Sequence, residues 1–182
     1  MLKFFFSLIL IFYISETQAS IKNELIKNLE NTYNFSFNFE QNINGKVEYG
    51  ECVIQYPKKI FCKYDLENKK VLVSNGRSLV IKTKNSFYIY PIEKTPLNLI
   101  LNKDYLIKKI KYLDEKIIDK KFINYSFKEN QNEINIFFDK NNYNLVGWQT
   151  MDIYQNLNIT YVNLRSVNQK LEKNLFKLPN QD

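Results

Sequence analysis

The sequence predicts a mainly β protein with short helices, in which one antiparallel sheet curls on itself. Many short segments alternate apolar and polar residues, as a strand with one buried face does. Turn signals separate these segments at close spacing, which favours hairpin connections. No long segment has the periodicity of a helix. The 182 residues suffice for one domain with one core.

Residues 1–19 are predicted to be a cleaved signal peptide. Lys3 gives a positive tip, an apolar run extends from Phe4 to Ile14, and Ala19 is a small residue before the cut. The apolar run is shorter than the roughly 20 residues that span a membrane. No cysteine follows the cut to take a lipid. We therefore expect residues 20–182 to form a single soluble domain outside the cytoplasm.

A short amphipathic helix opens the predicted domain. Ser20 can cap its N-terminus. Ile21, Leu25 and Leu29 recur at intervals of four residues, so they form one apolar stripe. The helix is expected to end near Asn31, where the period of the apolar residues changes.

Strands are predicted over most of the remaining chain. Phe35, Phe37 and Phe39 alternate with polar residues, so the first strand has one buried face. Further strands are predicted at 47–56, 60–64, 71–74, 78–83, 87–91, 117–122, 133–139, 145–153 and 158–167. A second, very short helix lies between them, with Thr95 as its cap and Pro96 as its first residue.

Two turns define the predicted register of the middle strands. A two-residue turn at Asn75–Gly76 places Leu72 opposite Leu79, and one at Lys84–Asn85 places Ile81 opposite Tyr88. Both turns assign the same residues to one face, namely Leu72, Leu79, Ile81, Tyr88 and Tyr90. The other face carries Val71, Val73, Val80, Phe87 and Ile89. Because both faces are apolar, this part of the sheet should be covered on both sides.

The composition excludes several classes of enzyme. The chain has no His, which removes Ser-His and Cys-His nucleophile pairs and His-ligated zinc or haem. Two Cys cannot build a four-thiolate metal site, and four Gly do not form a phosphate-binding loop. No spacing singles out Asp139 and Asp152 as a hydrolytic pair. We expect no catalytic residue, no metal and no cofactor.

The net charge of +7 arises largely from lysines between Lys103 and Lys128. These lysines form either a solvated face or a surface that docks electrostatically onto an acidic partner or anionic lipid headgroups. Nucleic acid is not expected, because the chain is predicted to be exported and its basic residues carry no RNA-binding aromatic signature.

Cys52 and Cys62 lie on either side of Pro57. A loop centred on Pro57 makes them directly opposed on paired strands, within reach of a disulfide outside the cytoplasm. Two buried free thiols are the alternative. A shift of one residue would place Cys52 opposite Lys63 and forbid the bond.

The chain contains 14 Phe, 13 Tyr and one Trp. Any single aromatic residue is most simply explained as core. Together with strands that are apolar on both faces, and without a catalytic set, they predict a container for an apolar ligand.

Several short motifs follow one another along nearly the whole chain. They are Phe35-x-Phe37-x-Phe39-x-Gln41, Gly50 to Pro57 with an apolar return strand, Val71-Leu72-Val73-Ser74-Asn75-Gly76, Tyr90-Pro91-x-x-x-Thr95-Pro96-Leu97, Leu145-x-x-Trp148-x-x-x-Asp152 and Leu175-Phe176. Their order and spacing resemble the outer-membrane lipoprotein carrier protein family, LolA.

The resemblance implies an incomplete, strongly curved antiparallel β-barrel covered by short helices that form a lid. It implies a soluble periplasmic chaperone that binds the acyl chains of lipoproteins in a hydrophobic cavity and carries them from the inner to the outer membrane. The implied partners are acylated lipoproteins, an inner-membrane ATP-driven lipoprotein release complex and, where present, an outer-membrane acceptor lipoprotein. We expect a monomer that is at most peripheral to a membrane.

Some positions of the family carry over directly. Leu72 and Ile60 match cavity positions, and residues 95–101 match a helix that helps to form the lid. With the apolar faces described above, the predicted lipid-binding residues are Phe37, Phe39, Ile54, Ile60, Tyr64, Leu72, Leu79, Ile81, Tyr88, Tyr90, Leu97, Leu101 and Trp148.

Two positions depart from the family. Well-known members carry Arg just before the hairpin proline, where it holds the lid shut, and this chain has Tyr56 there, which can donate one hydrogen bond. Cys62 stands where Trp is common, which leaves a roomier wall or one linked to Cys52. An alternative function is a periplasmic regulatory or scaffolding module of the same half-barrel fold that binds a protein partner.

Overall fold

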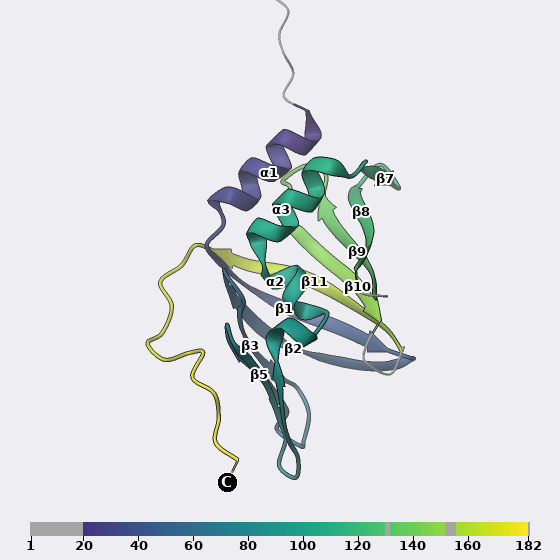
Figure 1. The fold of residues 1–182 in the computed structure, drawn as a ribbon. Coiled ribbons are helices and arrows are strands. Elements are labelled where there is room, and N and C mark those ends of the chain that lie inside the picture. The colour runs from purple at the N-terminus through teal and green to yellow at the C-terminus, as the bar shows by residue number, and fades with distance from the viewer. Residues whose placement is uncertain (1–19, 130–131, 152–155, 182) are drawn as a thin grey trace, which may run out of the picture.

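The computed structural model describes residues 20–129, 132–151 and 156–181 (Figure 1). Its strands are β1 (Asn34–Ile43), β2 (Lys46–Gln55), β3 (Lys59–Tyr64), β4 (Val71–Asn75), β5 (Ser78–Lys82), β6 (Phe87–Pro91), β7 (Lys116–Ile118), β8 (Phe122–Glu129), β9 (Asn132–Asp139), β10 (Leu145–Met151) and β11 (Leu157–Val167). Its helices are α1 (Ile21–Asn31), the 3-10 helix η1 (Ile92–Lys94), α2 (Leu97–Leu101) and α3 (Lys103–Tyr112). The predicted leader, 1–19, lies outside the described residues.

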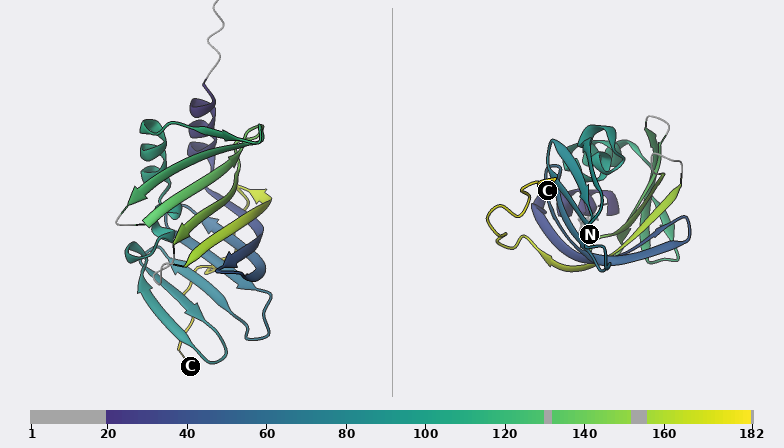
Figure 2. Two further views of the ribbon diagram at one scale, coloured as in Figure 1. Left: turned by 90° about the vertical axis from the view of Figure 1, so that its right-hand side faces the viewer. Right: turned by 90° about the horizontal axis from the view of Figure 1, so that it is seen from below.

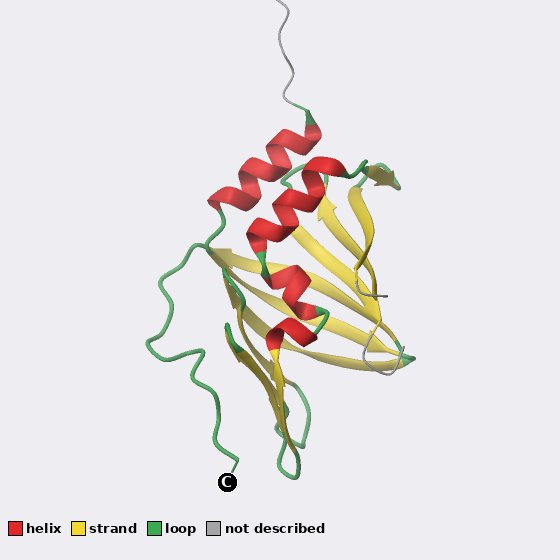
Figure 3. Cartoon of the chain, in the orientation of Figure 1, coloured by secondary structure: helices red, strands yellow, loops and turns green. Residues whose placement is uncertain are grey.

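The strands of the described residues form one antiparallel sheet in the order β6-β5-β4-β3-β2-β1-β11-β10-β9-β8-β7. β6 and β7 stay at opposite edges, so the sheet curves strongly but does not close (Figure 2). In the sequence η1, α2 and α3 lie between these two edge strands, and they cross the open side of the sheet (Figure 3). The predicted incomplete β-barrel covered by short helices is confirmed. Among the described residues, no helix is long and apolar enough to cross a membrane.

Helix α1 forms as its sequence predicts. The Ser20 hydroxyl accepts a hydrogen bond from the Asn23 N–H at 3.2 Å, which caps the first turn. Leu25 and Leu29 are buried on one face, and the helix ends at Asn31. Buried side chains of α1, α3 and the sheet belong to one continuous hydrophobic core.

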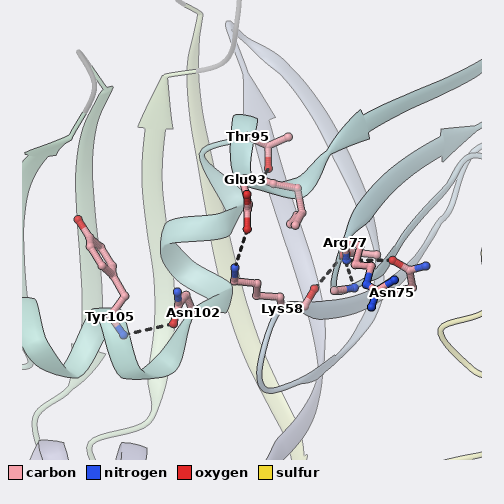
Figure 4. Close-up of polar contacts among 10 residues, drawn as sticks. Lys58, Asn75, Arg77, Glu93, Thr95, Asn102 and Tyr105 are labelled. Atoms are coloured by element: carbon pink, nitrogen blue, oxygen red, sulfur yellow. Dashed lines mark hydrogen bonds and ion pairs between the residues drawn. The ribbon is translucent and has the colours of Figure 1, made fainter.

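Helix α3 was not predicted, because the lysine-rich segment hides its apolar stripe. Leu106, Ile107 and Ile110 follow the spacing of a helix face and are buried. The Asn102 side chain accepts a hydrogen bond from the Tyr105 N–H at 3.3 Å and caps the first turn (Figure 4). The apolar spacing of a helix was therefore present in the sequence, but the high charge of the segment made it resemble a solvated loop.

The predicted strand 117–122 is wrong, because the chain reverses inside it. Asp119 and Lys120 both have positive φ, at 50° and 58°, and form the turn between β7 and β8. β8 then extends to Glu129, well beyond the predicted end. Predicted strand 145–153 corresponds to β10, whose described part ends at Met151, and residues 152–153 lie outside the described residues.

The register of β4 and β5 differs from the prediction by two residues. Leu72 lies opposite Ile81, not Leu79. The Asn75 side-chain oxygen accepts from the N–H groups of both Arg77 and Ser78, at 3.0 Å each, so the loop is longer than the two-residue turn (Figure 4). Because a shift of two keeps each side chain on its face, the predicted faces still hold.

The second turn is confirmed, since β5 and β6 pair as predicted, with Ile81 opposite Tyr88. The expected coverage on both sides is confirmed for β4 and β5, but not for β6, where Tyr88 and Ile89 are 52% and 57% exposed. Leu72 and Leu79 are buried on the concave side, while Val73 and Val80 are buried on the outer side. The outer side of β3–β5 is crossed by the C-terminal tail, residues 168–181 (Figure 1).

Cys52 and Cys62 pair directly across β2 and β3, as predicted. They form a disulfide, which decides between the bonded and free alternatives. The link joins the two strands at the fourth residue pair from their connecting turn at Pro57.

Candidate ligand cavity

The concave face of the sheet encloses a cavity of about 290 Å³ beneath η1 and α2. Its apolar wall consists of Phe39, Ile43, Cys52, Ile60, Cys62, Tyr64, Leu72, Leu79, Ile81, Tyr90, Pro96, Leu97, Ile100, Trp148 and Met151. Pockets for small ligands commonly measure about 300–1,000 Å³ and are mostly apolar, so the volume of this cavity lies just below that range.

Most of the predicted lipid-binding residues line the cavity. They are Phe39, Ile60, Tyr64, Leu72, Leu79, Ile81, Tyr90, Leu97 and Trp148. Phe37, Ile54 and Leu101 point into the solid core instead and do not line it. Tyr88 lies near the β5–β6 turn with 52% of its surface exposed, so it is also outside the wall.

A glycine lets two aromatic rings meet across the wall. Phe39 on β1 and Tyr64 on β3 both pair with Gly50 of β2, which lies between them. Their ring centroids are 4.9 Å apart in an edge-to-face arrangement. A Cβ at Gly50 would lie 2.2 Å from the Lys63 carbonyl oxygen and 2.8 Å from the Phe39 ring. Burial raises the pKa of the Tyr64 hydroxyl, which therefore stays protonated at neutral pH.

The segment over the cavity is fastened to the β2–β3 turn by Lys58. Its N–H donates to the Leu101 carbonyl at 2.9 Å, and its ammonium lies 3.3 Å from the Glu93 carboxylate (Figure 4). Glu93 is largely exposed, so this ion pair contributes at most about 1 kcal/mol. The Thr95 hydroxyl donates back to the Ile92 carbonyl at 2.8 Å, so the predicted cap of α2 is wrong.

Tyr56 stands where the family commonly has Arg, and it does not fasten this segment. Its ring packs against Phe35, with centroids 6.0 Å apart, and the Lys103 ammonium lies 5.7 Å from the ring centroid. Burial raises the pKa of the Tyr56 hydroxyl. Tyr56 therefore contacts α3 through Lys103, whereas the hydrogen bond to α2 and the ion pair with η1 come from Lys58, two residues later.

One part of the cavity wall is polar, which the sequence analysis missed. We call it the polar band, and it consists of Gln41, Lys70, Thr150, Asn158 and Thr160. The signal was an interruption of the apolar alternation, because inward positions of β1 change from Phe39 to Gln41. Lys94 and Thr95 also line the cavity, from the segment above it.

A buried carboxylate, that of Glu48, forms an ion pair with Lys70 of the polar band. Glu48 is 4% exposed and contacts the ammonium groups of Lys70 at 2.5 Å and Lys46 at 2.9 Å. Burial alone would raise the pKa of Glu48, but hydrogen bonds and charges from the two lysines outweigh it and lower the pKa. Glu48 is therefore ionised at neutral pH.

Two lysines of the basic segment are engaged within the molecule. Lys109 pairs with Glu129 at 2.9 Å, and Lys103 donates to the backbone carbonyls of Glu30 and Thr32 at 3.0 Å each. This pairing raises the pKa of Lys109 through its hydrogen bond to Glu129. Part of the positive segment thus stabilises the helix layer.

The family model described as outer membrane lipoprotein carrier protein LolA matches residues 30–179. The chain belongs to the LolA family. This family includes lipoprotein-binding carriers. No curated protein sequence matches this LolA-family chain.

Solved structures that are similar to this LolA-family chain share little sequence with it. A putative outer membrane lipoprotein-sorting protein domain from Vibrio parahaemolyticus is 10% identical, with a TM-score of 0.49 over 86% of this chain and 94% of that one. LprF from Mycobacterium bovis is 13% identical, with a TM-score of 0.45 over 84% and 93% of the two chains. A LolA superfamily protein from Nitrosomonas europaea is 5% identical, with a TM-score of 0.45 over 88% and 99%.

Proposed function

We propose that this protein is a soluble periplasmic carrier that shelters the acyl chains of lipoproteins in its cavity. The observation that carries the proposal is the largely apolar cavity beneath η1 and α2, in a chain of the LolA family. In this proposal the protein receives its cargo from an inner-membrane ATP-driven release complex and yields it to an acceptor in the outer membrane. It acts without catalysis.

The energetics of transfer require such a cavity to be adaptable. Each buried methylene gains about 0.8 kcal/mol on leaving water. A bilayer shelters the same chain from water equally well, so moving the chain from a membrane into the cavity gains little free energy. Loading must therefore be driven, and the free-energy change of unloading must be close to zero. The cavity of about 290 Å³ has room for little more than one chain, so a cargo with several chains requires η1 and α2 to move aside.

Charge placed on the wall tests the proposal. Ile81→Glu and Leu72→Glu put a carboxylate among the apolar cavity residues, where an acyl chain would leave it desolvated. We expect both variants to lose most co-purifying acylated protein from the exported pool, measured by mass spectrometry after solvent extraction. Ile89→Glu is the matched control, because Ile89 is 57% exposed on the outer face of β6.

Unchanged loading of both cavity variants would reject the acyl-binding role of the wall. Circular dichroism and thermal unfolding of each variant establish that the fold persists. Loading that is lost equally in Ile89→Glu would also count against the cavity, because that residue does not line it.

A further inference from the structure

The inward side chains change chemistry as the strands approach the β1–β2 turn. Along β1 the buried aromatic Phe39 is followed by Gln41, which pairs with Glu48 on β2 and Thr160 on β11. One row further on, Asn158 of β11 lies opposite Thr150 of β10. The polar band thus lies across neighbouring strands within an otherwise apolar wall, with Ile43 and Met151 beside it, and this mixture suits an amphiphile rather than a plain hydrocarbon.

The two buried charges in this region neutralise each other: Glu48 is 4% exposed and Lys70 is 17% exposed, whereas the second lysine, Lys46, is 73% exposed to water. Glu48 is ionised and contacts both Lys70 and Lys46. A second carboxylate placed there would meet the buried negative charge of Glu48, and an added ammonium would meet the two lysines. An uncharged polar group avoids both costs.

The hydrogen bonds of the polar band leave one acceptor unmatched. Tyr64 donates to Gln41 Oε1 at 3.1 Å, and Gln41 Nε2 donates to Thr160 Oγ1 at 3.2 Å. Asn158 Oδ1 is shielded from solvent and accepts no hydrogen bond from any residue of the described chain. A buried acceptor without a hydrogen bond costs free energy, which a ligand that donates to it would recover. The Thr160 hydroxyl accepts a hydrogen bond from Gln41 and can also donate its own proton to a ligand.

We propose that the polar band seats the amide group of an N-acylated ligand. The ligand N–H donates to Asn158 Oδ1, and its carbonyl oxygen accepts from the Thr160 hydroxyl, while the acyl chain extends along the apolar wall. This inference rests on the proposed function. It assigns the bound class as an acyl chain in amide linkage, in preference to the corresponding ester or free fatty acid.

Matched ligands that differ in one group test the seat. N-methyldodecanamide and methyl dodecanoate have the same chain and carbonyl, and only the amide has an N–H. We expect the full-length exported protein to bind the amide about fivefold to tenfold more tightly than the ester, the size of one neutral hydrogen bond. Competition against an environment-sensitive fluorescent lipid measures both affinities.

Substitution of the acceptor assigns the preference to its residue. Asn158→Leu should bind the ester as the unaltered protein does and should bind the amide no better than the ester. Asn163→Leu is the matched control, because Asn163 is exposed on the outer side of the same strand, and it should keep the preference. Retained ester binding shows that the variant is folded.

The outcomes separate this inference from the proposed function. Equal binding of amide and ester by the unaltered protein overturns the amide seat and leaves acyl binding intact. A preference that persists in Asn158→Leu overturns its assignment to Asn158. Failure to bind either ligand overturns the proposed function itself.

Discussion

At the scale of single residues, buried polar atoms have effects on stability that are easy to measure. Tyr125 is fully buried, and its hydroxyl makes no hydrogen bond with the described residues. Burial raises the pKa of this hydroxyl to about 12, with a smaller effect from the charge of Glu115. The hydroxyl is therefore protonated and costs stability in the core.

Tyr125→Phe should consequently stabilise the protein by about 1 kcal/mol, because it removes an unsatisfied hydroxyl and keeps the ring. Urea unfolding measures the difference. Tyr161→Phe is the control and should change little, since Tyr161 is 54% exposed. Destabilisation by Tyr125→Phe would show that the hydroxyl has a stabilising partner.

Glu48 makes the stability of the protein depend on pH. Because the folded-state pKa of Glu48 is lowered, its ionised form contributes stability above the ordinary value of about 4.3. That contribution is lost as the pH falls through the lowered pKa. Glu48→Gln should cost about 1–3 kcal/mol at pH 7, because Lys70 loses its carboxylate, and the cost should shrink as the pH falls through the lowered pKa.

Thermal unfolding from pH 3 to pH 7 tests this dependence. Glu51→Gln is the control, since Glu51 is half-exposed and its ion pair with Arg165 lies on the surface. Parallel pH profiles for Glu48→Gln and the unaltered protein would contradict the prediction.

At the scale of elements, the β2–β3 hairpin determines the shape of the cavity. It supplies Ile60, the disulfide between Cys52 and Cys62, and the turn from which Lys58 reaches Leu101 and Glu93. The wall and the segment above it are therefore connected through one hairpin.

The Cys52→Ala/Cys62→Ala double variant should lose about 2–3 kcal/mol of stability, the amount expected for a link that closes a loop of this length. Denaturant unfolding with and without reductant measures it. Reductant should destabilise the unaltered protein by a similar amount and leave the double variant unchanged. A reductant effect on the double variant would place the sensitivity elsewhere.

At the scale of the whole molecule, the C-terminal tail completes the outer surface of the sheet. The Lys59 ammonium lies 5.9 Å from the Phe176 ring centroid, and Lys82 donates to the Asn180 carbonyl at 2.7 Å. Val73 of β4 lies between these two attachments and is almost fully buried.

A chain that ends at residue 168 should therefore expose the outer side of β4 and β5. We expect a loss of about 2 kcal/mol or more, because Val73 and Val80 would lie in water. Increased fluorescence of a dye that binds apolar surfaces reports the exposure. A chain that ends at residue 180 is the control, and unchanged dye binding by the shorter chain would contradict the role of the tail.

Local sequence patterns were sufficient to predict those strands that bury one face. The alternation of Phe35, Phe37 and Phe39 predicted β1, and the spacing around Pro57 predicted the pairing of Cys52 with Cys62. The cavity wall followed from the same alternation, since side chains on one face of a curved strand meet inside it. Phe37 lay on the predicted face but in solid core, because alternation identifies a face and not the depth along it.

The sequence by itself determined the strand order of each hairpin, the apolar concave face and the family, because each depends on neighbours in the chain or on motif order. Only the tertiary structure decided how residues distant in sequence combine. It brought Glu48 to Lys70, and Gln41 to Thr160, and it placed Asn158 in the same cavity wall. Such pairs depend on sheet register and curvature, which many weak contacts across the whole molecule establish together.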